Sequence, residues 1–126
     1  MPELPEVEVV RAGLAAALPG RTIATVRVLH PRSVRRHAGG PADFETLLVG
    51  RELGTPRRRG KFLWFPFADG DALAAHLGMS GQFRLDQPGL PRHPHTRVVL
   101  GLGDNAQELR FVDQRIFGGL WFAPAG

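Results

Sequence analysis

The sequence predicts a mainly β protein with helices: an antiparallel β-sandwich flanked by an N-terminal helix and one further short helix. Three observations predict this class. Short strand-like runs recur through the second half of the chain and are broken by Gly, Pro, Asp and Asn. Only two segments show the features of a helix. A length of 126 residues suits one domain with a core of its own.

The first 50 residues contain both predicted helices and one strand. Leu4 to Leu18 carries a helical stripe of apolar residues that ends at Pro19-Gly20. Arg21 to His30 alternates apolar and polar residues, as a half-buried strand does. Pro31 to Gly40 is a basic loop that ends in glycine. Pro41 to Leu48 is typical of a short helix, because proline suits the first helical turn.

The remainder of the chain is predicted to be β structure. Asp69-Gly70 and Asp104-Asn105 mark hairpin turns between strands. The strand-like runs lie at residues 61–67, 72–77, 82–85, 96–102, 107–112 and 119–122. Neither internal repeats nor low-complexity segments interrupt this pattern.

Composition limits the classes of partner and compartment. A net charge of +4 and a pI near 11.2 favour a polyanionic partner without identifying it. The chain has no cysteine, so these residues form neither a disulfide nor a thiolate zinc site. No apolar run is long enough to span a bilayer, and the start lacks the order of a signal peptide. We therefore expect a soluble intracellular protein.

The first six residues offer a nucleophile beside two acids. Removal of Met1 would make Pro2 a free secondary amine close to Glu3 and Glu6. An α-amine has a pKa near ~8, against ~10.4 for lysine, so far more of it is unprotonated at neutral pH. Its iminium with a sugar aldehyde stays cationic and acts as an electron sink, and nearby carboxylates suit acid–base catalysis. Pro-Glu is also an ordinary helix start, and residues 1–6 alone favour that interpretation.

Two further clusters have both functional and ordinary interpretations. Arg57 to Lys61 places four cations in five residues before an apolar strand, which indicates either a phosphate site or a solvated face. His93-Pro94-His95 has the spacing of two metal ligands, but no acidic or thiol ligand is near in sequence. We therefore predict no metal site and no cofactor in this chain.

Four strings occur in order along the chain and resemble bacterial formamidopyrimidine-DNA glycosylase. They are Met-Pro-Glu-Leu-Pro-Glu-Val-Glu at the start, Arg-Gly-Lys-Phe-Leu at 59–63, His-Leu-Gly-Met-Ser-Gly at 76–81 and Asp-Gln-Arg-Ile-Phe-Gly-Gly at 113–119. The resemblance covers residues 1–126 as the family's N-terminal catalytic domain, and it implies a two-layer β-sandwich flanked by helices. The family's helix-two-turn-helix and four-cysteine zinc ribbon are absent here, so we expect the gene to continue past Gly126 and to encode one zinc site there.

The resemblance also implies roles for individual residues. The catalytic set is Pro2 as nucleophile, Glu3 as the acid that protonates the deoxyribose ring oxygen, Glu6 as an organiser of the site, and Lys61 as the contact to the phosphate beside the lesion. His76 and His95 resemble further DNA-backbone contacts, although a histidine in such a setting is often structural, and for His95 this alternative stays open.

Three residues resemble the side chains that fill the space of an extruded base. Met79 and Phe117 resemble its wedge, and Arg115 resembles the arginine that bonds the orphaned cytosine. The alternative is that Met79 and Phe117 are core residues. Flanking glycines favour surface turns, since turns carry side chains outward. Gln114 and Ile116 depart from the family's commoner Asp-Pro-Arg-Arg-Phe-Gly, which affects loop rigidity or a phosphate contact more than base extrusion.

The resemblance implies a bifunctional DNA glycosylase and AP lyase. Its partner would be double-stranded DNA that contains oxidised purines, such as formamidopyrimidines or 8-oxoguanine opposite cytosine, or abasic sites. Schiff-base formation at Pro2 would be followed by β- and δ-elimination. We expect a monomer in the bacterial cytoplasm, associated with the nucleoid through DNA. The rival hypothesis is a DNA-binding module without catalysis; a structural sandwich with accidental motifs would require four coincidences.

Overall fold

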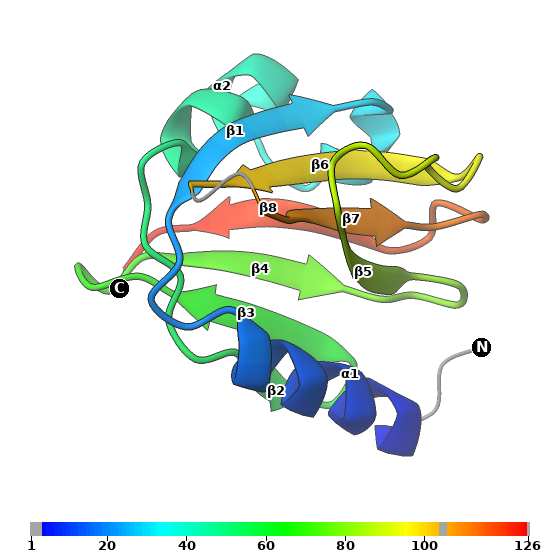
Figure 1. Ribbon diagram of the computed structural model, residues 1–126, viewed down its shortest axis with the longest axis horizontal. Helices are drawn as coiled ribbons and strands as arrows, with labels where there is room; N and C mark the ends of the chain where they lie inside the picture. The colour runs from blue at the N-terminus through cyan, green and yellow to red at the C-terminus, as the bar shows by residue number, and fades with distance from the viewer. Residues whose placement is uncertain (1–3, 104–105, 126) are drawn as a thin grey trace.

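Two four-stranded antiparallel sheets form a sandwich, as the sequence predicts (Figure 1). The computed structural model describes residues 4–103 and 106–125. One sheet has the strand order β1-β6-β7-β5 and the other β2-β3-β4-β8. The strands are β1 (Ile23–Val28), β2 (Arg57–Arg59), β3 (Phe62–Pro66), β4 (Ala72–His76), β5 (Gln82–Asp86), β6 (Thr96–Leu102), β7 (Glu108–Val112) and β8 (Gly119–Ala123).

The two predicted α-helices lie at opposite edges of the sandwich (Figure 1). The first, α1 (Leu4–Ala17), lies against β2, and the second, α2 (Gly40–Leu48), packs on β1. A carboxylate oxygen of Glu45 in α2 accepts a hydrogen bond of 2.8 Å from the backbone N–H of Val28. Since β1 is an edge strand, this contact occupies a donor that would otherwise be open to another chain. Within the described ranges, no helix is long and apolar enough to cross a bilayer.

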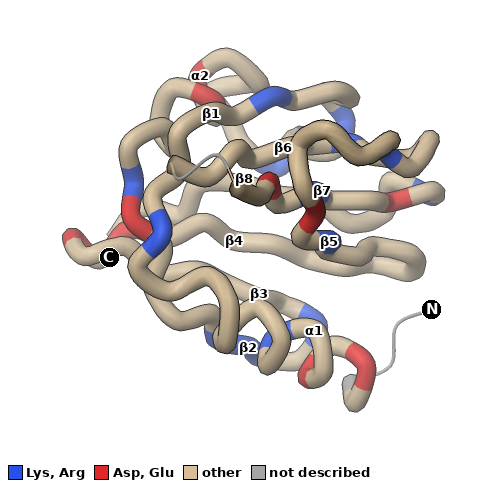
Figure 2. Tube along the Cα trace, in the orientation of Figure 1, with Lys and Arg blue, Asp and Glu red and all other residues tan. Residues whose placement is uncertain are grey.

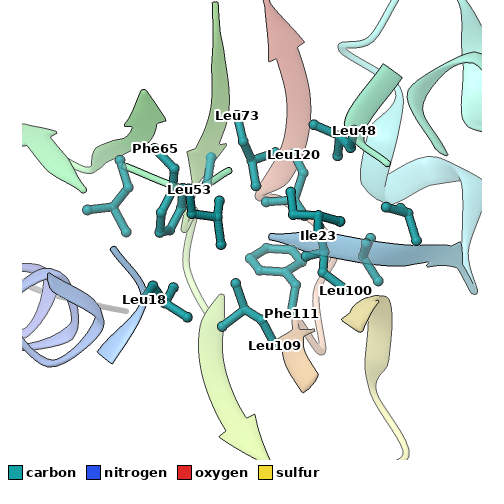
Figure 3. Packing of buried hydrophobic residues seen from close by; sticks show 14 of the residues in the cluster. Leu18, Ile23, Leu48, Leu53, Phe65, Leu73, Leu100, Leu109, Phe111 and Leu120 are labelled. Carbon is teal, nitrogen blue, oxygen red and sulfur yellow. The ribbon is translucent and has the colours of Figure 1, made fainter. Parts of the chain in front are cut away.

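The core lies between the sheets and receives side chains from both helices (Figure 3). Full burial of a large apolar side chain contributes about 1.5–3 kcal/mol relative to its exposure, so this cluster is the main stabilising element. Leu18, which directly follows α1, and Leu48 of α2 enter the core from the helix side. The facing sheets contribute Phe65, Leu73, Leu100, Leu109, Phe111 and Leu120.

The region from Pro31 to Lys61 differs most from the sequence prediction. Pro31–Val34 forms a short 3-10 helix, η1, inside the predicted loop. Arg57–Arg59 forms strand β2, which antiparallel pairing with Phe62–Pro66 of β3 stabilises despite its three arginines. Arg58 Nε donates a hydrogen bond of 3.0 Å to Glu8 of α1, so one arginine of the run is part of the fold. Figure 2 shows the basic positions of β2, in blue, next to α1.

Of the two predicted hairpin turns, Asp69-Gly70 is confirmed. It connects β3 to β4, and Gly70 has a φ of 95°, a conformation that favours glycine. Asp104-Asn105 lies outside the described residues.

Candidate functional site

Of the three predicted catalytic residues near the N-terminus, the structure describes Glu6, at the start of α1. Pro2 and Glu3 are outside the described residues. Glu6 is exposed in the first helical turn, where it lines an open cavity of about 420 Å³ together with Met79 and Ser80. The cavity therefore places the acid-bearing end of α1 beside the loop that carries Met79, 73 positions further along the chain in the numbering of the sequence.

The predicted wedge residues come from two loops, which we call the paired loops: residues 77–81 between β4 and β5, and residues 113–118 between β7 and β8. Hydrogen bonds join them directly. Ser80 Oγ donates to Asp113 Oδ1 at 2.6 Å and accepts from the backbone N–H of Arg115 at 3.0 Å. Asp113 is fully buried, and its Oδ2 accepts from the backbone N–H of Gly118 at 3.0 Å. Ser80 and Asp113 thus hold the loops together.

Two glycines permit a close approach of the loop backbones. Gly78 has a φ of 58°, and a Cβ there would lie 2.6 Å from the backbone nitrogen of Gly118. A Cβ on Gly118 would collide with the carbonyl oxygen of His76. Both positions therefore require glycine, because no Cβ fits there. At Gly78 the positive φ also favours glycine.

The predicted wedge side chains on the paired loops point away from the core. Met79 is 39% exposed and Phe117 is 44% exposed, and Arg115 is also exposed. This exposure rejects the alternative that Met79 and Phe117 are core residues. Ile116 has a φ of 56°, which is strained for a β-branched residue, and its carbonyl accepts a hydrogen bond from Arg35.

Two arginines that the sequence analysis did not select support the second paired loop. Arg35, just after η1, donates from Nη1 to the carbonyls of Ile116 and Gly118 at 3.1 Å each, and from Nη2 to that of Phe117 at 3.1 Å. Arg36 Nη2 donates to the carbonyl of Phe117 at 3.3 Å. Burial, followed by the charges of neighbouring arginines, lowers the pKa of Arg35. Their only sequence signal was the basic character of residues 31–40.

His76 and Lys61 lie beside the paired loops. The structure places His76 at the end of β4, where its Nδ1 accepts the backbone N–H of Gly78 at 2.9 Å. Neutral His76 therefore carries its proton on Nε2. Its ring meets that of Phe62 edge to face at 4.5 Å between centroids. Burial, and then the charges of Arg36 and Lys61, lower the pKa of His76.

His95 lies at the base of the second paired loop. Its carbonyl accepts the backbone N–H of Asp113 at 3.0 Å, and its Nδ1 lies 3.2 Å from Arg97 Nη2. These contacts show a structural role for His95 and leave its predicted DNA contact untested. Its ring is 5.3 Å from that of His93. In residues 4–103 and 106–125 there is no group of three or more His, Asp or Glu side chains that could hold a metal ion.

The fold and these loops define a β-sandwich domain in which two loops, in close contact at glycines, lie next to an open cavity at the start of a helix. Residues 1–120 match the family model for the formamidopyrimidine-DNA glycosylase N-terminal domain. The chain therefore belongs to the formamidopyrimidine-DNA glycosylase family, as the sequence motifs indicated.

Comparison with individual proteins agrees with this assignment. The chain is 58% identical to a formamidopyrimidine-DNA glycosylase of Nocardioides sp., over 100% of this chain and 43% of that protein, and 56% identical to one of Acidothermus cellulolyticus, over 98% and 44%. A complex of Lactococcus lactis Fpg with DNA containing an abasic site has a TM-score of 0.86 and 32% identity, over 95% of this chain and 43% of that chain. The chain thus spans less than half the length of these relatives.

Proposed function

We propose that this chain is the catalytic N-terminal domain of a bifunctional DNA glycosylase and AP lyase that removes oxidised purines from DNA. The observation that carries the proposal is the exposure of Met79, Arg115 and Phe117 on loops fixed to one another beside the cavity that Glu6 lines. An enzyme that attacks the sugar of a base must first extrude that base and fill its place. Rigid loops with exposed side chains suit this task, because insertion then requires little reordering.

The relatives support the choice of substrate. Solved structures of Lactococcus lactis Fpg, similar to this chain, contain DNA with an abasic site and DNA with FAPY-dG. By the family resemblance, the Pro2 amine attacks C1′, Glu3 protonates the ring oxygen, and the departing base leaves an iminium from which β- and δ-elimination proceed. Lys61 and His76 would hold the DNA backbone, and Arg115 would bond the cytosine opposite the lesion. This chemistry requires that Met1 be removed.

The remaining expectations concern the full-length protein. The chain has no cysteine and its described residues form no metal cluster, so they do not fit a structural zinc. We propose that the zinc belongs to the part by which the relatives exceed this chain. We also propose that the protein is a monomer and acts on the chromosome in the cytoplasm.

The decisive experiment is borohydride trapping with single-stranded DNA that contains one abasic site. After intact mass has verified the loss of Met1, a covalent complex should form and peptide mass should place it at Pro2. A variant that retains Met1 is the matched control and should trap nothing, because its Pro2 nitrogen is an amide. Trapping mapped to Lys61 would contradict the proposal.

The rival hypothesis is a DNA-binding module without catalysis. The same assay separates the two, because a binding module would bind the abasic strand and form no adduct. The variant Glu3→Gln also distinguishes the enzyme from the binding module. It is made in a fusion of this chain with the C-terminal region of the Nocardioides relative. Excision should be lost while DNA affinity stays nearly intact, since this carboxylate acts on the sugar.

A further inference from the structure

A row of residues crosses the second sheet at the end nearest the paired loops. Antiparallel register places Arg59 opposite Phe62, Phe62 opposite His76, and His76 opposite Gly119. Side chains at paired positions share one face of a sheet, and Phe62 is 46% exposed, so this is the outer face. Gly119 leaves a space in the row, and the side chain of Arg36 occupies it: a Cβ on Gly119 would lie 3.0 Å from Arg36 Nη1.

Two contacts fix the guanidinium of Arg36 in that space. Its Nη2 donates to the carbonyl of Phe117 at 3.3 Å, and its Cζ lies over the Trp121 ring, 5.8 Å from the centroid. A guanidinium has five N–H donors, and in the part of the chain that the structure describes Arg36 has this one hydrogen bond and no ion pair. The remaining donors are available to a ligand, and the side chain is already held in place.

Three basic groups therefore meet without a counterion. His76 pairs with Phe62, which directly follows Lys61, and with Gly119, whose open space Arg36 occupies. In agreement with this placement, burial and then the charges of Arg36 and Lys61 lower the pKa of His76. Lys61 lies in the turn between β2 and β3, and within the described residues it forms no ion pair. The backbone N–H of Gly78, a neutral group, donates a hydrogen bond to Nδ1 of the His76 ring. Nε2 of His76 is therefore left for a ligand.

We propose that Arg36, Lys61 and His76 bind one backbone phosphate of DNA, with Arg36 as a ligand that the family motifs in this sequence do not include. The inference rests on the proposed function and names the partner chemistry of a neighbouring part of that site. A phosphate group matches the arrangement because it accepts several hydrogen bonds from cations that approach from different sides.

The hydrogen bond from Arg36 to the Phe117 carbonyl connects the phosphate site with the wedge. The guanidinium that would bind the phosphate also bonds the carbonyl of Phe117, which is a residue of the wedge. Binding of the DNA backbone and the position of Phe117 in the wedge are then linked through the guanidinium of Arg36. Phosphate binding would favour the protonated form of His76, since an anion beside the ring offsets the charges of Arg36 and Lys61.

The test measures binding of the 126-residue chain to a duplex with one tetrahydrofuran site, by fluorescence anisotropy across a series of salt concentrations. Arg36→Met removes the charge and retains an unbranched apolar side chain over Trp121. Arg32→Met is the matched control, because it removes one exposed charge from η1 in the same segment. Arg36→Met should weaken binding about tenfold and reduce the log–log salt slope by about 0.9, and Arg32→Met should change the slope by less than half of that.

A second readout follows the His76 ring by NMR as the pH is changed. In the free protein, Arg36→Met should raise the pKa of His76 and Arg32→Met should not. Addition of the duplex to the wild-type chain should raise it as well. Equal salt slopes for wild type and Arg36→Met, or equal losses in the two variants, would overturn the assignment of Arg36. If Lys61→Ala still lowers the slope in that case, the proposed function stands without Arg36; if it does not, the backbone site itself is wrong.

Discussion

Ser80 joins the paired loops through two hydrogen bonds, so Ser80→Ala should separate them. The substitution removes the donor to Asp113 Oδ1 and the acceptor of the Arg115 N–H, at 2.6 and 3.0 Å. It adds no atom, so no new collision arises. Asp113 is fully buried and would retain only the hydrogen bond from Gly118 among those that the structure describes for its side chain.

The magnitude follows from the two bonds. A hydrogen bond to a carboxylate contributes roughly 1.5–3 kcal/mol, and one between neutral groups roughly 0.5–1.5 kcal/mol. Part of the loss will be recovered if water reaches the carboxylate oxygen, because Ser80 is only half-buried. We therefore expect Ser80→Ala to lower the free energy of unfolding by about 2–4 kcal/mol, a large share of the ~5–15 kcal/mol typical of a domain.

Urea unfolding followed by tryptophan fluorescence measures this change. Thr46→Ala is the matched control: its hydroxyl donates to the carbonyl of Ala42 on the exposed side of α2, and the cost should stay within about 0.5 kcal/mol. Hydrogen exchange gives a local readout, since the amide of Arg115 should exchange faster in Ser80→Ala. A cost equal to that of Thr46→Ala, with unchanged exchange at Arg115, would refute the idea that this pair holds the loops.

Two further predictions concern α1 and the wedge. Hydrogen bonds from Arg11 and then Arg58 lower the pKa of Glu8 from 4.5 to about 2, so its stabilising contribution is present above pH ~4.5 and is lost as the pH falls through about 2. Glu8→Gln should therefore reduce Tm at neutral pH and match the wild type near pH 2, and a gap that is constant with pH would contradict this. Phe117→Ala should slow excision from duplex DNA in the full-length protein more than lyase action on a single-stranded abasic site. Leu90→Ala, which removes another exposed apolar side chain, should affect neither, and equal losses on both substrates for Phe117→Ala would indicate a folding defect.

The sequence could predict the parts of the site that depend on local chemistry. Glycine-flanked turns place Met79 and Phe117 on the surface because the turn geometry is encoded within a few residues of each side chain. The support of these loops could not be predicted in this way. Ser80 meets Asp113 33 positions away, and Arg36 meets Phe117 81 positions away, contacts that only the packing of the two sheets and η1 creates.

The strands show the same limit. Alternation and turn residues predicted most of them, but Arg57–Arg59 was interpreted as a basic run because three arginines carry no apolar pattern. Pairing with β3 decides its conformation, and Glu8 of α1 neutralises one of its charges. Tertiary context thus overrides a weak local preference at this strand.

The distribution of charge explains why the net charge of +4 could suggest a polyanion but could not locate its site. Acidic side chains are held by arginines in pairs that stabilise loops and element ends. These pairs join Arg11 and Arg58 to Glu8, Arg51 to Asp69 and Asp71, and Arg110 to Asp86 and Glu108.

Arg36 and Lys61 are two of the several described cations without an ion pair, and they lie next to His76 and the paired loops. A phosphate that arrives there displaces no carboxylate and gains hydrogen bonds from groups already held in position, whereas one that meets Arg51 or Arg110 must compete with an existing pair. Counterion release should therefore include the end of the second sheet that lies next to the wedge. Under the proposed function, contact with the backbone and insertion of Phe117 would occur at adjacent groups, so a nonspecific encounter at this end of the sheet would already bring the wedge close to the duplex.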